Sequence, residues 1–432
     1  MVNPNFLDMT LKANDPLLKS WVEIDSDSDF PIQNLPFGIF STTTIQHRTG
    51  VAIGNNVVDI KALAELGYLD GLNIEPSLFE NEYINEFMAL GKEKCREVRN
   101  RISDLLSTNS SELQGNNDHV NKVLLSMADV TMRMPVKIGD YTDFYSSIEH
   151  ATNVGTMFRD PDNALLPNWK HLPVGYHGRA SSIILSGTDI HRPKGQTKAD
   201  DAAQPTYGPC RLLDFELEMA FITGKHNPLG SSISTSNAED YIFGMVLFND
   251  WSARDIQKWE YVPLGPFLAK NFASSISPWV VTLDALEPFK VKGPNQDPAV
   301  LPYLAYEGNK NYDINLEVCI QPENSQETRV CLSNFKYMYW NMCQQLAHHT
   351  VNGCDINIGD FYASGTISGK EPSSYGSMLE LSWKGTKTIE MTDGSERKFI
   401  NDMDTVTMRG YANKDKVRIG FGEVKTKVLP AI

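Results

Sequence analysis

The sequence has no uninterrupted apolar run near the ~18 residues that a membrane-spanning helix needs. Its N-terminal segment is mixed polar and lacks the apolar core of a secretory signal peptide, so we expect a cytoplasmic protein that binds no membrane. Positive charge is also scarce, since 39 Lys and Arg residues stand against 54 Asp and Glu residues, for a net charge of −15. A chain this acidic repels phosphate backbones, which disfavours nucleic-acid binding. A site for an anionic substrate must therefore gather its positive charge locally, from Arg, Lys or a metal ion.

Several common motifs are missing. The six cysteines are scattered and form no C-x-x-C pair, which argues against a zinc ribbon or a disulfide framework and favours reduced, mostly buried thiols. The sequence has no G-x-G-x-x-G after a predicted strand, no Walker A sequence, no H-E-x-x-H and no G-x-S-x-G. These absences count against dinucleotide enzymes, P-loop enzymes, common zinc proteases and α/β-hydrolases.

The N-terminal part mixes strand and helix patterns. Two apolar runs within 51–60, separated by Gly54-Asn55-Asn56, predict a β-hairpin. Ser77 and Glu80 have the spacing of a helical capping box. Farther on, apolar residues recur at the spacing of one helix face: Val98, Ile102, Leu105 and Leu106.

A Ser-, Asn- and Gly-rich stretch at 108–118 is typical of a linker or an exposed loop. We therefore expect a domain boundary near residues 120–135, with an N-terminal domain over 1–135 and a large domain over 136–432. The large domain is rich in Gly, Pro, aromatic residues and short β-like runs, and it lacks strand–helix alternation. This composition predicts a β-rich domain.

Acidic residues accompany two predicted strands of the large domain. In 215–219 the alternation places Glu216 and Glu218 on one face of a strand, where they repel each other unless something neutralises them. Taken alone, this segment favours the simpler interpretation, a half-buried strand with a wet outer face, over a metal site. Asp250 follows the end of an apolar run at 242–248 and is either a turn residue or a ligand. Converging carboxylates would suit Ca²⁺ or Mg²⁺ better than zinc or copper.

Two further segments carry polar residues at helical spacing. The first places four residues on one face if the segment is helical: Asp250, Arg254, Gln257 and Tyr261. A solvated surface helix is the simpler alternative, although the aromatic and Pro residues around it are unusual for one. With nearby Lys270, this segment offers the donors that an oxyanion needs.

The second such segment has Asp143 and His150 seven residues apart, which would also share a helix face, although a lone His is most often structural. Near the C-terminus, the small residues of 363–369 allow a close backbone approach to a ligand, or only a tight turn. The alternation of Leu379-Glu380-Leu381 predicts a strand that turns Glu380 away from the core.

These segments together resemble the fumarylacetoacetase family. The resemblance rests on D-Y-T-D-F-Y-S-S…H-A-T-N-V-G (140–155), L-P-V-G-Y-H-G-R-A-S-S (172–182), L-L-D-F-E-L-E-M-A-F (212–221), F-G-M-V-L-F-N-D-W-S-A-R-D-I-Q-K-W-E-Y-V-P-L-G-P-F (243–267), A-S-G-T-I-S-G (363–369) and G-S-M-L-E-L-S-W-K-G (376–385). It covers nearly all of 135–430 and is weaker before residue 120. It implies a mostly β fold, with an N-terminal SH3-like β-barrel, a large β-roll catalytic domain and a homodimer.

The resemblance also implies a site, residue by residue. The implied Ca²⁺ ligands are Asp143, Glu216, Glu218 and Asp250. A second site, of the Mg²⁺ type, would use Asp250, Lys270 through its carbonyl, and Ser274 where the family has Thr. His150 would be the general base oriented by Glu380, and Arg254, Gln257 and Lys270 would form the electrophilic cluster. The implied substrate contacts are Tyr145, Arg159, Tyr176, Gln257, Tyr261 and Thr366.

The implied reaction is hydrolysis of a C–C bond in a small β-diketo acid, giving fumarate and acetoacetate at the end of tyrosine and phenylalanine catabolism. One alternative is an acylpyruvate hydrolase or a related β-diketone enzyme of the same superfamily, which the long N-terminal domain disfavours. A non-heme iron oxygenase would need two His ligands and one carboxylate, whereas these segments supply one His among carboxylates. A β-rich binding module without activity is disfavoured because every matched catalytic position is present.

Overall fold

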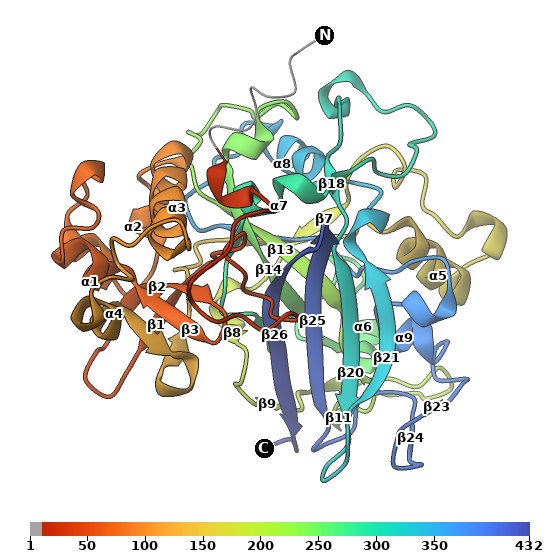
Figure 1. Ribbon diagram of the computed structural model, residues 1–432. Helices are drawn as coiled ribbons and strands as arrows, with labels where there is room; N and C mark the ends of the chain where they lie inside the picture. Colours follow the sequence, from red (N-terminus) through yellow and green to blue (C-terminus); the bar gives the residue numbers. More distant parts are fainter. Residues whose placement is uncertain (1–10) are drawn as a thin grey trace.

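The computed structural model describes residues 11–432 (Figure 1). The N-terminal part forms a five-stranded antiparallel sheet in the order β4-β3-β2-β1-β5. Its strands are β1 (Phe37–Ser41), β2 (Arg48–Ile53), β3 (Asn56–Asp59), β4 (Leu124–Ser126) and β5 (Thr131–Arg133). The hairpin predicted at 51–60 is confirmed, since β2 and β3 pair across a turn at Gly54, whose φ of 52° is in the left-handed region.

Four helices accompany this sheet: α1 (Ile60–Glu65), α2 (Asn85–Met88), α3 (Lys92–Leu106) and α4 (Asn117–Val123). The helix predicted around Val98 is confirmed as α3, and the four apolar residues of its predicted face are all buried. The capping box predicted at Ser77 is wrong. A 3-10 helix (Pro76–Glu80) begins at the preceding proline, so Ser77 lies inside its first turn and the N-cap is Glu75.

The large domain has two main sheets. The first has eight strands, ordered β7-β6-β22-β13-β14-β16-β8 with β17 also beside β14. They are β6 (Tyr141–Phe144), β7 (Gly175–His177), β8 (Ile183–Leu185), β13 (Leu217–Thr223), β14 (Ile242–Asp250), β16 (Ser274–Ile276), β17 (Val281–Thr282) and β22 (Phe361–Ala363). The second has five strands, ordered β21-β20-β25-β26-β9. They are β9 (Ile190–His191), β20 (Asn315–Gln321), β21 (Thr328–Asn334), β25 (Thr405–Lys414) and β26 (Val417–Leu429).

The core of the large domain lies between these two sheets. Leu247 of β14, Leu316 of β20 and Met408 of β25 are fully buried in one apolar cluster. The sheets approach closely at Gly410, where a Cβ atom would lie 2.8 Å from the side chain of Leu247. The expectation of a mostly β chain with a separate N-terminal domain is confirmed, and the division at residue 135 stays a prediction.

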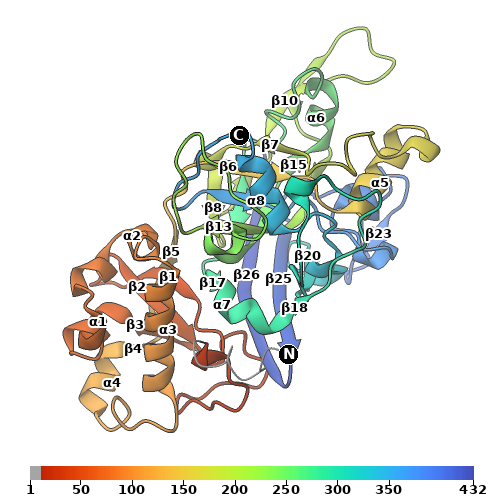
Figure 2. The same cartoon turned by 90° about the horizontal axis from the view of Figure 1, so that it is seen from above.

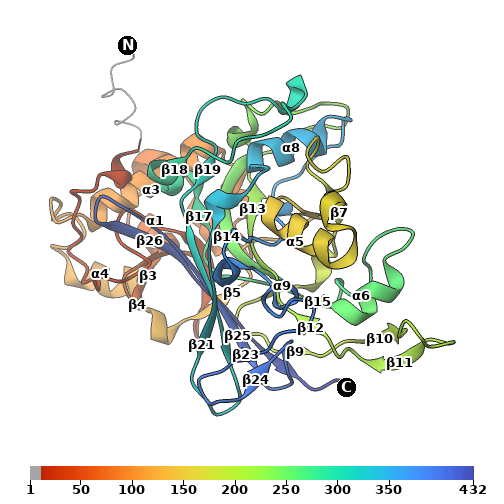
Figure 3. The same cartoon turned by 90° about the vertical axis from the view of Figure 1, so that its right-hand side faces the viewer.

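Shorter elements surround the sheets. The hairpin of β10 (Lys194–Thr197) and β11 (Thr206–Pro209) projects from the body, at the lower right of Figure 3. The other short strands are β12 (Leu213–Asp214), β15 (Ser252–Ala253), β18 (Lys290–Val291), β19 (Asn311–Tyr312), β23 (Ile389–Glu390) and β24 (Glu396–Arg397). The helices are α5 (Ile148–Phe158), α6 (Arg254–Glu260), α7 (Leu283–Leu286), α8 (Met342–Thr350) and α9 (Met378–Leu381). Among the described residues, no helix has the length and apolar composition for a membrane crossing.

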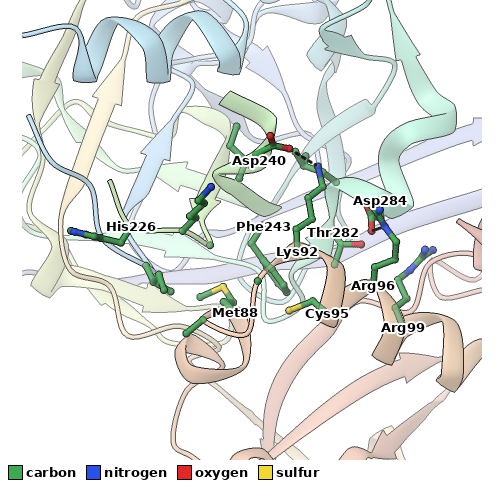
Figure 4. Close-up of a pocket in the computed structure, with 17 residues that line it drawn as sticks. Met88, Lys92, Cys95, Arg96, Arg99, His226, Asp240, Phe243, Thr282 and Asp284 are labelled. Carbon is green, nitrogen blue, oxygen red and sulfur yellow. Dashed lines mark hydrogen bonds and ion pairs between the residues drawn. The ribbon is translucent and has the colours of Figure 1, made fainter. Parts of the chain in front are cut away.

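The N-terminal domain lies beside the large domain, as Figure 2 shows at its lower left. Phe37 and Val280 exchange backbone hydrogen bonds of 3.0 and 2.8 Å across the boundary. A cavity of about 390 Å³ lies between α3 on one side and β14 and α7 on the other (Figure 4). Its charged groups are mostly paired across it: Arg96 of α3 holds Asp284 in a two-point contact of 2.7 and 2.8 Å. This cavity therefore belongs to the contact between the domains.

Candidate active site

Four acidic side chains meet at one edge of the eight-stranded sheet. Asp143 is on β6, Glu218 on β13 and Asp250 at the end of β14, while Glu216 immediately precedes β13. One carboxylate oxygen from each lies within 4.8 Å of the others, and all four residues are buried. The half-buried strand weighed for 215–219 is wrong, because both faces of β13 are covered. The structure thus brings together the four residues expected as Ca²⁺ ligands.

The four carboxyl groups differ in their electrostatics. Burial, followed by the charge of the neighbouring carboxylates, raises the pKa of Asp143 and of Glu218 well above the usual range. Burial also raises the pKa of Asp250, against the effect of the Lys270 ammonium. At Glu216, burial is outweighed by Arg254 and Lys270, so the pKa of this carboxyl is lowered.

The cluster holds more carboxyl groups than its cationic protein partners can pair with. With Asp214, five buried carboxyl groups face two cationic side chains, Arg254 and Lys270. Among the described residues, Asp143 Oδ1 and Glu218 Oε1 are buried without a hydrogen-bond partner. Orphaned carboxylate oxygens in a converging set are what a hard divalent cation binds. The residues therefore fit a metal ion with oxygen ligands.

Within the described residues, three side chains bond to the carboxylate of Asp250. Lys270 Nζ lies 2.6 Å from Asp250 Oδ2 and also bonds to Glu216. The hydroxyl of Ser274 donates to Asp250 Oδ1 at 2.8 Å, and that of Tyr176 donates to Oδ2 at 3.2 Å. The roles expected for the Lys270 carbonyl and the Ser274 hydroxyl at a second cation stay predictions, since both side chains here serve Asp250.

The electrophilic residues come from a short helix and a turn: Arg254 and Gln257 are on α6, and Lys270 lies in the turn before β16. The prediction that 250–261 shares one helix face is wrong: Asp250 ends β14, and α6 covers only Arg254–Glu260. Arg254 begins that helix, donates to Asp214 at 2.8 Å and to Gln257 at 3.3 Å, and forms an ion pair with Glu216 at 2.7 Å. Arg254 and Gln257 still meet, because residues three apart are neighbours on a helix surface.

His150 and Glu380 form a buried pair. His150 Nδ1 lies 2.7 Å from Glu380 Oε2, and both side chains are almost fully buried. The expectation that Asp143 and His150 share a helix is wrong, because Asp143 is on β6 and α5 begins later, with Ser147 as its N-cap. The pKa of Glu380 is lowered, because His150 and several hydrogen bonds outweigh the effect of burial.

The predicted strand at Glu380 is also wrong, because these residues form the short helix α9. Ser377 caps this helix by accepting from the Glu380 N–H. The carboxylate of Asp214 accepts from the N–H groups of Met378 and Leu379 at 2.6 and 3.0 Å. Side chains thereby satisfy three N–H groups that a first helical turn leaves free, and the local alternation cannot reveal this tertiary support.

The residues expected to contact substrate fall into two groups. Tyr145, Tyr176 and Thr366 lie at the site: the Tyr145 ring packs 5.2 Å from that of His150, and the Thr366 hydroxyl is buried without a partner among the described residues. Arg159 and Tyr261 lie on exposed segments, after α5 and α6. The Arg159 guanidinium donates to the Ala164 carbonyl at 2.7 Å.

Sequence reasoning missed some residues of the site. Asp214 continues the alternation of Glu216 and Glu218, and that signal could have predicted its place beside Arg254. Gly365 donates its N–H to Glu218 at 2.9 Å, so the segment 363–369 reaches the acidic cluster, and the close approach to a ligand expected there stays a prediction. Asn153, Ser368 and Ser377 all bond to Glu380. The S-x-x-E spacing of Ser377 and Glu380 is a capping-box signal that could have found Ser377, whereas no sequence pattern relates Asn153 or Ser368 to Glu380.

Comparison with known proteins covers nearly the whole chain. Residues 141–429 match the model of the fumarylacetoacetate (FAA) hydrolase C-terminal family, and residues 33–135 match that of the fumarylacetoacetase N-terminal family. The chain is 56% identical to a fumarylacetoacetase of Dictyostelium discoideum, over 96% of this chain and 99% of that one. It is 55% identical to a fumarylacetoacetase of Homo sapiens, with the same coverage.

A solved structure supports the same fold at low sequence identity. A fumarylacetoacetate hydrolase from Exiguobacterium antarcticum aligns with a TM-score of 0.52 and 17% identity, over 92% of this chain and 99% of that one. At this identity the similarity concerns the fold alone.

Proposed function

The chain belongs to the fumarylacetoacetase family, and from that membership we propose that its buried acidic cluster is where 4-fumarylacetoacetate is hydrolysed to fumarate and acetoacetate. The chain is accordingly a C–C bond hydrolase of tyrosine and phenylalanine catabolism. Identities of 48–56% over 96% of the chain favour this substrate over the acylpyruvate alternative. The observation that carries the mechanism is the His150–Glu380 pair, buried beside an acidic cluster that holds Arg254 and Lys270.

The pair is suited to activate water. Because His150 Nδ1 faces a carboxylate, we assign its proton to Nδ1, which leaves the lone pair on Nε2 to accept a proton from water. The hydroxide attacks the ketone carbon next to the double bond. Glu380 then stabilises the imidazolium that forms. When the C–C bond breaks, its electron pair stays on the carbon of the acetoacetate fragment that formed the bond. The imidazolium then gives its proton to this carbon.

The electrophilic residues stabilise the negative charge that develops on substrate oxygens. Gln257 Oε1 faces Arg254, so its NH₂ group is the end that can donate to a substrate oxygen. Lys270 has three donors and uses two of them on Glu216 and Asp250, so one is left. Burial lowers the effective dielectric around these donors and strengthens their effect on an oxyanion.

A metal ion completes the proposed site. The proposed Ca²⁺ ligands are Asp143, Glu216, Glu218 and Asp250, and a Mg²⁺-type site would use Asp250, Lys270 and Ser274. When bound, such a cation supplies Lewis-acid polarisation of the diketone oxygens. The orphaned oxygens of Asp143 and Glu218 support this assignment.

Substrate contacts are proposed at the rim of the site. Arg159 is exposed, and its Nη1 is not used in the contact with Ala164, so it can reach a substrate carboxylate. Tyr145, Tyr176 and Thr366 line the buried side. Tyr261 follows α6 in an exposed segment and would close against bound substrate.

We also propose a homodimer and a cytoplasmic location. A continuous run of the chain at the end of α6 and beyond exposes several large apolar side chains besides Tyr261: Trp259, Val262, Leu264, Phe267 and Leu268. Exposed apolar groups concentrated in one segment are typical of a contact surface. Light scattering after size exclusion tests the dimer. All six cysteines are free, which fits a reducing compartment.

The test of the reaction is product analysis. The chain is incubated with 4-fumarylacetoacetate, and the products are followed by NMR together with the loss of diketone absorbance. We expect fumarate and acetoacetate in equal amounts, and turnover of a simple acylpyruvate at a much lower kcat/KM. An acylpyruvate turned over faster than fumarylacetoacetate would contradict the assignment.

A further inference from the structure

The carboxylate of Glu380 accepts hydrogen bonds from other side chains besides His150. Glu380 Oε2 accepts from Ser368 Oγ at 2.9 Å and from Ser377 Oγ at 2.8 Å, in addition to His150. Glu380 Oε1 accepts from Asn153 Nδ2 at 2.9 Å. Glu380 and both serines are fully buried, so water cannot replace these bonds.

Hydrogen bonds from the backbone restrict the orientation of the two serine hydroxyls. Ser377 Oγ accepts the backbone N–H of Glu380 at 3.3 Å, and Ser368 Oγ accepts that of Gly376 at 3.0 Å. With an N–H already directed at each oxygen, each hydroxyl proton is directed at Glu380 Oε2. Both serines therefore act as fixed donors.

Asn153 provides the donor on the other oxygen. It lies three residues after His150 on α5, so the two side chains project from neighbouring turns of one helix face. One helix thus holds both oxygens of Glu380, which fixes the plane of the carboxylate relative to the imidazole ring. Figure 3 shows α5 and α9 next to each other, near α6 and β15.

We propose that Asn153, Ser368 and Ser377 are positioning residues that keep Glu380 ionised and oriented, so that His150 holds its proton on Nδ1 and presents Nε2 to water. This inference rests on the proposed function for its catalytic consequence. The arrangement itself predicts a property of the resting enzyme, which is a fixed Nδ1–H proton on His150. None of the three touches the substrate in this scheme.

Losing a donor to Glu380 should shift the pH dependence of kcat/KM in one direction. With fewer donors, the charge of Glu380 is less compensated, and the Glu380–His150 pair takes up a proton at higher pH. Because the active form is the deprotonated pair, the acid limb of kcat/KM should move to higher pH. Other titratable groups near the pair are Tyr145, Glu149, Tyr375 and Cys331 beside Glu380, and Glu216 near His150. Glu149 is the carboxyl group among these that is not a proposed metal ligand, so the profiles are repeated with Glu149→Gln present.

The test compares Asn153→Ala and Ser368→Ala with Thr156→Ala. Thr156 is on the same helix, and within the described part of the chain its hydroxyl donates to the Thr152 carbonyl and not to Glu380, so it controls for damage to α5. For Asn153→Ala we expect kcat to fall about tenfold, as for a lost hydrogen bond to a charged group, with KM within about twofold. The acid limb should shift upward, and Ser368→Ala should shift it in the same direction. Thr156→Ala should leave kcat and the profile unchanged.

A second readout is independent of turnover. In one-dimensional proton NMR of the substrate-free enzyme, the Nδ1–H of His150 should give a low-field signal that is absent in His150→Gln. This signal should broaden or move in Asn153→Ala and stay in Thr156→Ala. An unmoved signal with an unmoved acid limb would overturn the positioning role, as would equal kcat losses in Asn153→Ala and Thr156→Ala. If wild type fails to hydrolyse fumarylacetoacetate, the proposed function fails, and the NMR comparison still decides the role of Asn153.

Discussion

Glu216 and Glu218 are two residues apart and chemically identical, yet the structure gives them opposite pKa shifts. Arg254 and Lys270 contact Glu216 and lower its pKa, whereas burial and the charge of Asp143 raise that of Glu218. Residue type alone does not decide which carboxyl is ionised, because the neighbours in space do. At this scale, each functional group is defined by the partners that its buried position supplies.

The pair of His150 and Glu380 allows a residue-scale prediction. Replacing His150 by Ala should lower kcat by about 10²–10⁴-fold, as for a lost general base, while metal content is kept. Glu380→Gln should also lower kcat, with a smaller effect on KM. The two losses should be strongly non-additive in the double variant, because both act through one proton transfer. Steady-state kinetics on the three variants measures this, and a loss equal to the product of the single losses would show that the residues act independently.

A second residue-scale prediction concerns pH and His349 of α8. Burial, followed by the charges of His177 and His348, lowers the pKa of His349 from 6.5 to about 4. Between these two values the unfolded chain binds a proton at this residue and the native chain does not, so the free energy of unfolding falls as pH falls through this window. His349→Gln should flatten that dependence between about pH 6.5 and 4. Urea unfolding at several pH values measures it, and parallel curves for wild type and variant would contradict the shift.

At the scale of elements, short segments are set by tertiary contacts more than by local pattern. The continuous apolar run of β14 and the periodicity of α3 are enough to predict a buried strand and a helix. The alternation around Glu380 predicts a strand, but the Asp214 carboxylate and the Ser377 hydroxyl satisfy the N–H groups of a helical turn instead. Asp214 and Met378 are 164 positions apart, a separation that no local window can detect.

The dependence of α9 on Asp214 can be tested by measuring stability. Asp214→Asn replaces an acceptor oxygen with an NH₂ group that must face either Arg254 or the N–H groups that begin α9. We expect a loss of about 3 kcal/mol in the free energy of unfolding, as when one partner of a buried ion pair is removed. Asp201→Asn, at an exposed position, should change stability by less than about 0.5 kcal/mol. Equal stabilities for the two variants in urea unfolding would show that α9 does not depend on Asp214.

For the whole molecule, the contact between the two domains is partly electrostatic. Arg96 of α3 and Asp284 of α7 form its two-point ion pair, with side-chain exposures of 23% and 10%. Arg96→Met should lower the free energy of unfolding by about 1–3 kcal/mol, because it leaves Asp284 without its cation. Lys94→Ala on the same helix removes an exposed pair with Glu97 and should cost at most about 0.5 kcal/mol. Calorimetry measures both, and kcat should be unchanged in each, since neither residue lies at the active site. Equal losses in the two variants would contradict a stabilising role for the Arg96 pair.

The sequence predicts part of the site, and the rest depends on the folding of the whole molecule. The family motifs place Asp143, Glu216, Glu218 and Asp250 in one group, and the structure brings their carboxylates together. Helical spacing cannot relate Asp143 to His150, because a strand end and a new helix separate them. Asn153 and Ser368 reach Glu380 from other segments of the chain, so only the folded molecule reveals these two donors.

The central claim is that the buried acidic cluster holds a divalent cation that hydrolysis requires. The most direct measurement follows the turnover of 4-fumarylacetoacetate by chain freed of metal with a chelator, then titrated with Ca²⁺ or Mg²⁺ while bound metal is counted. We expect that activity is lost on metal removal and returns in proportion to bound cation, and that Glu218→Gln weakens cation binding. Full turnover by metal-free chain would contradict it.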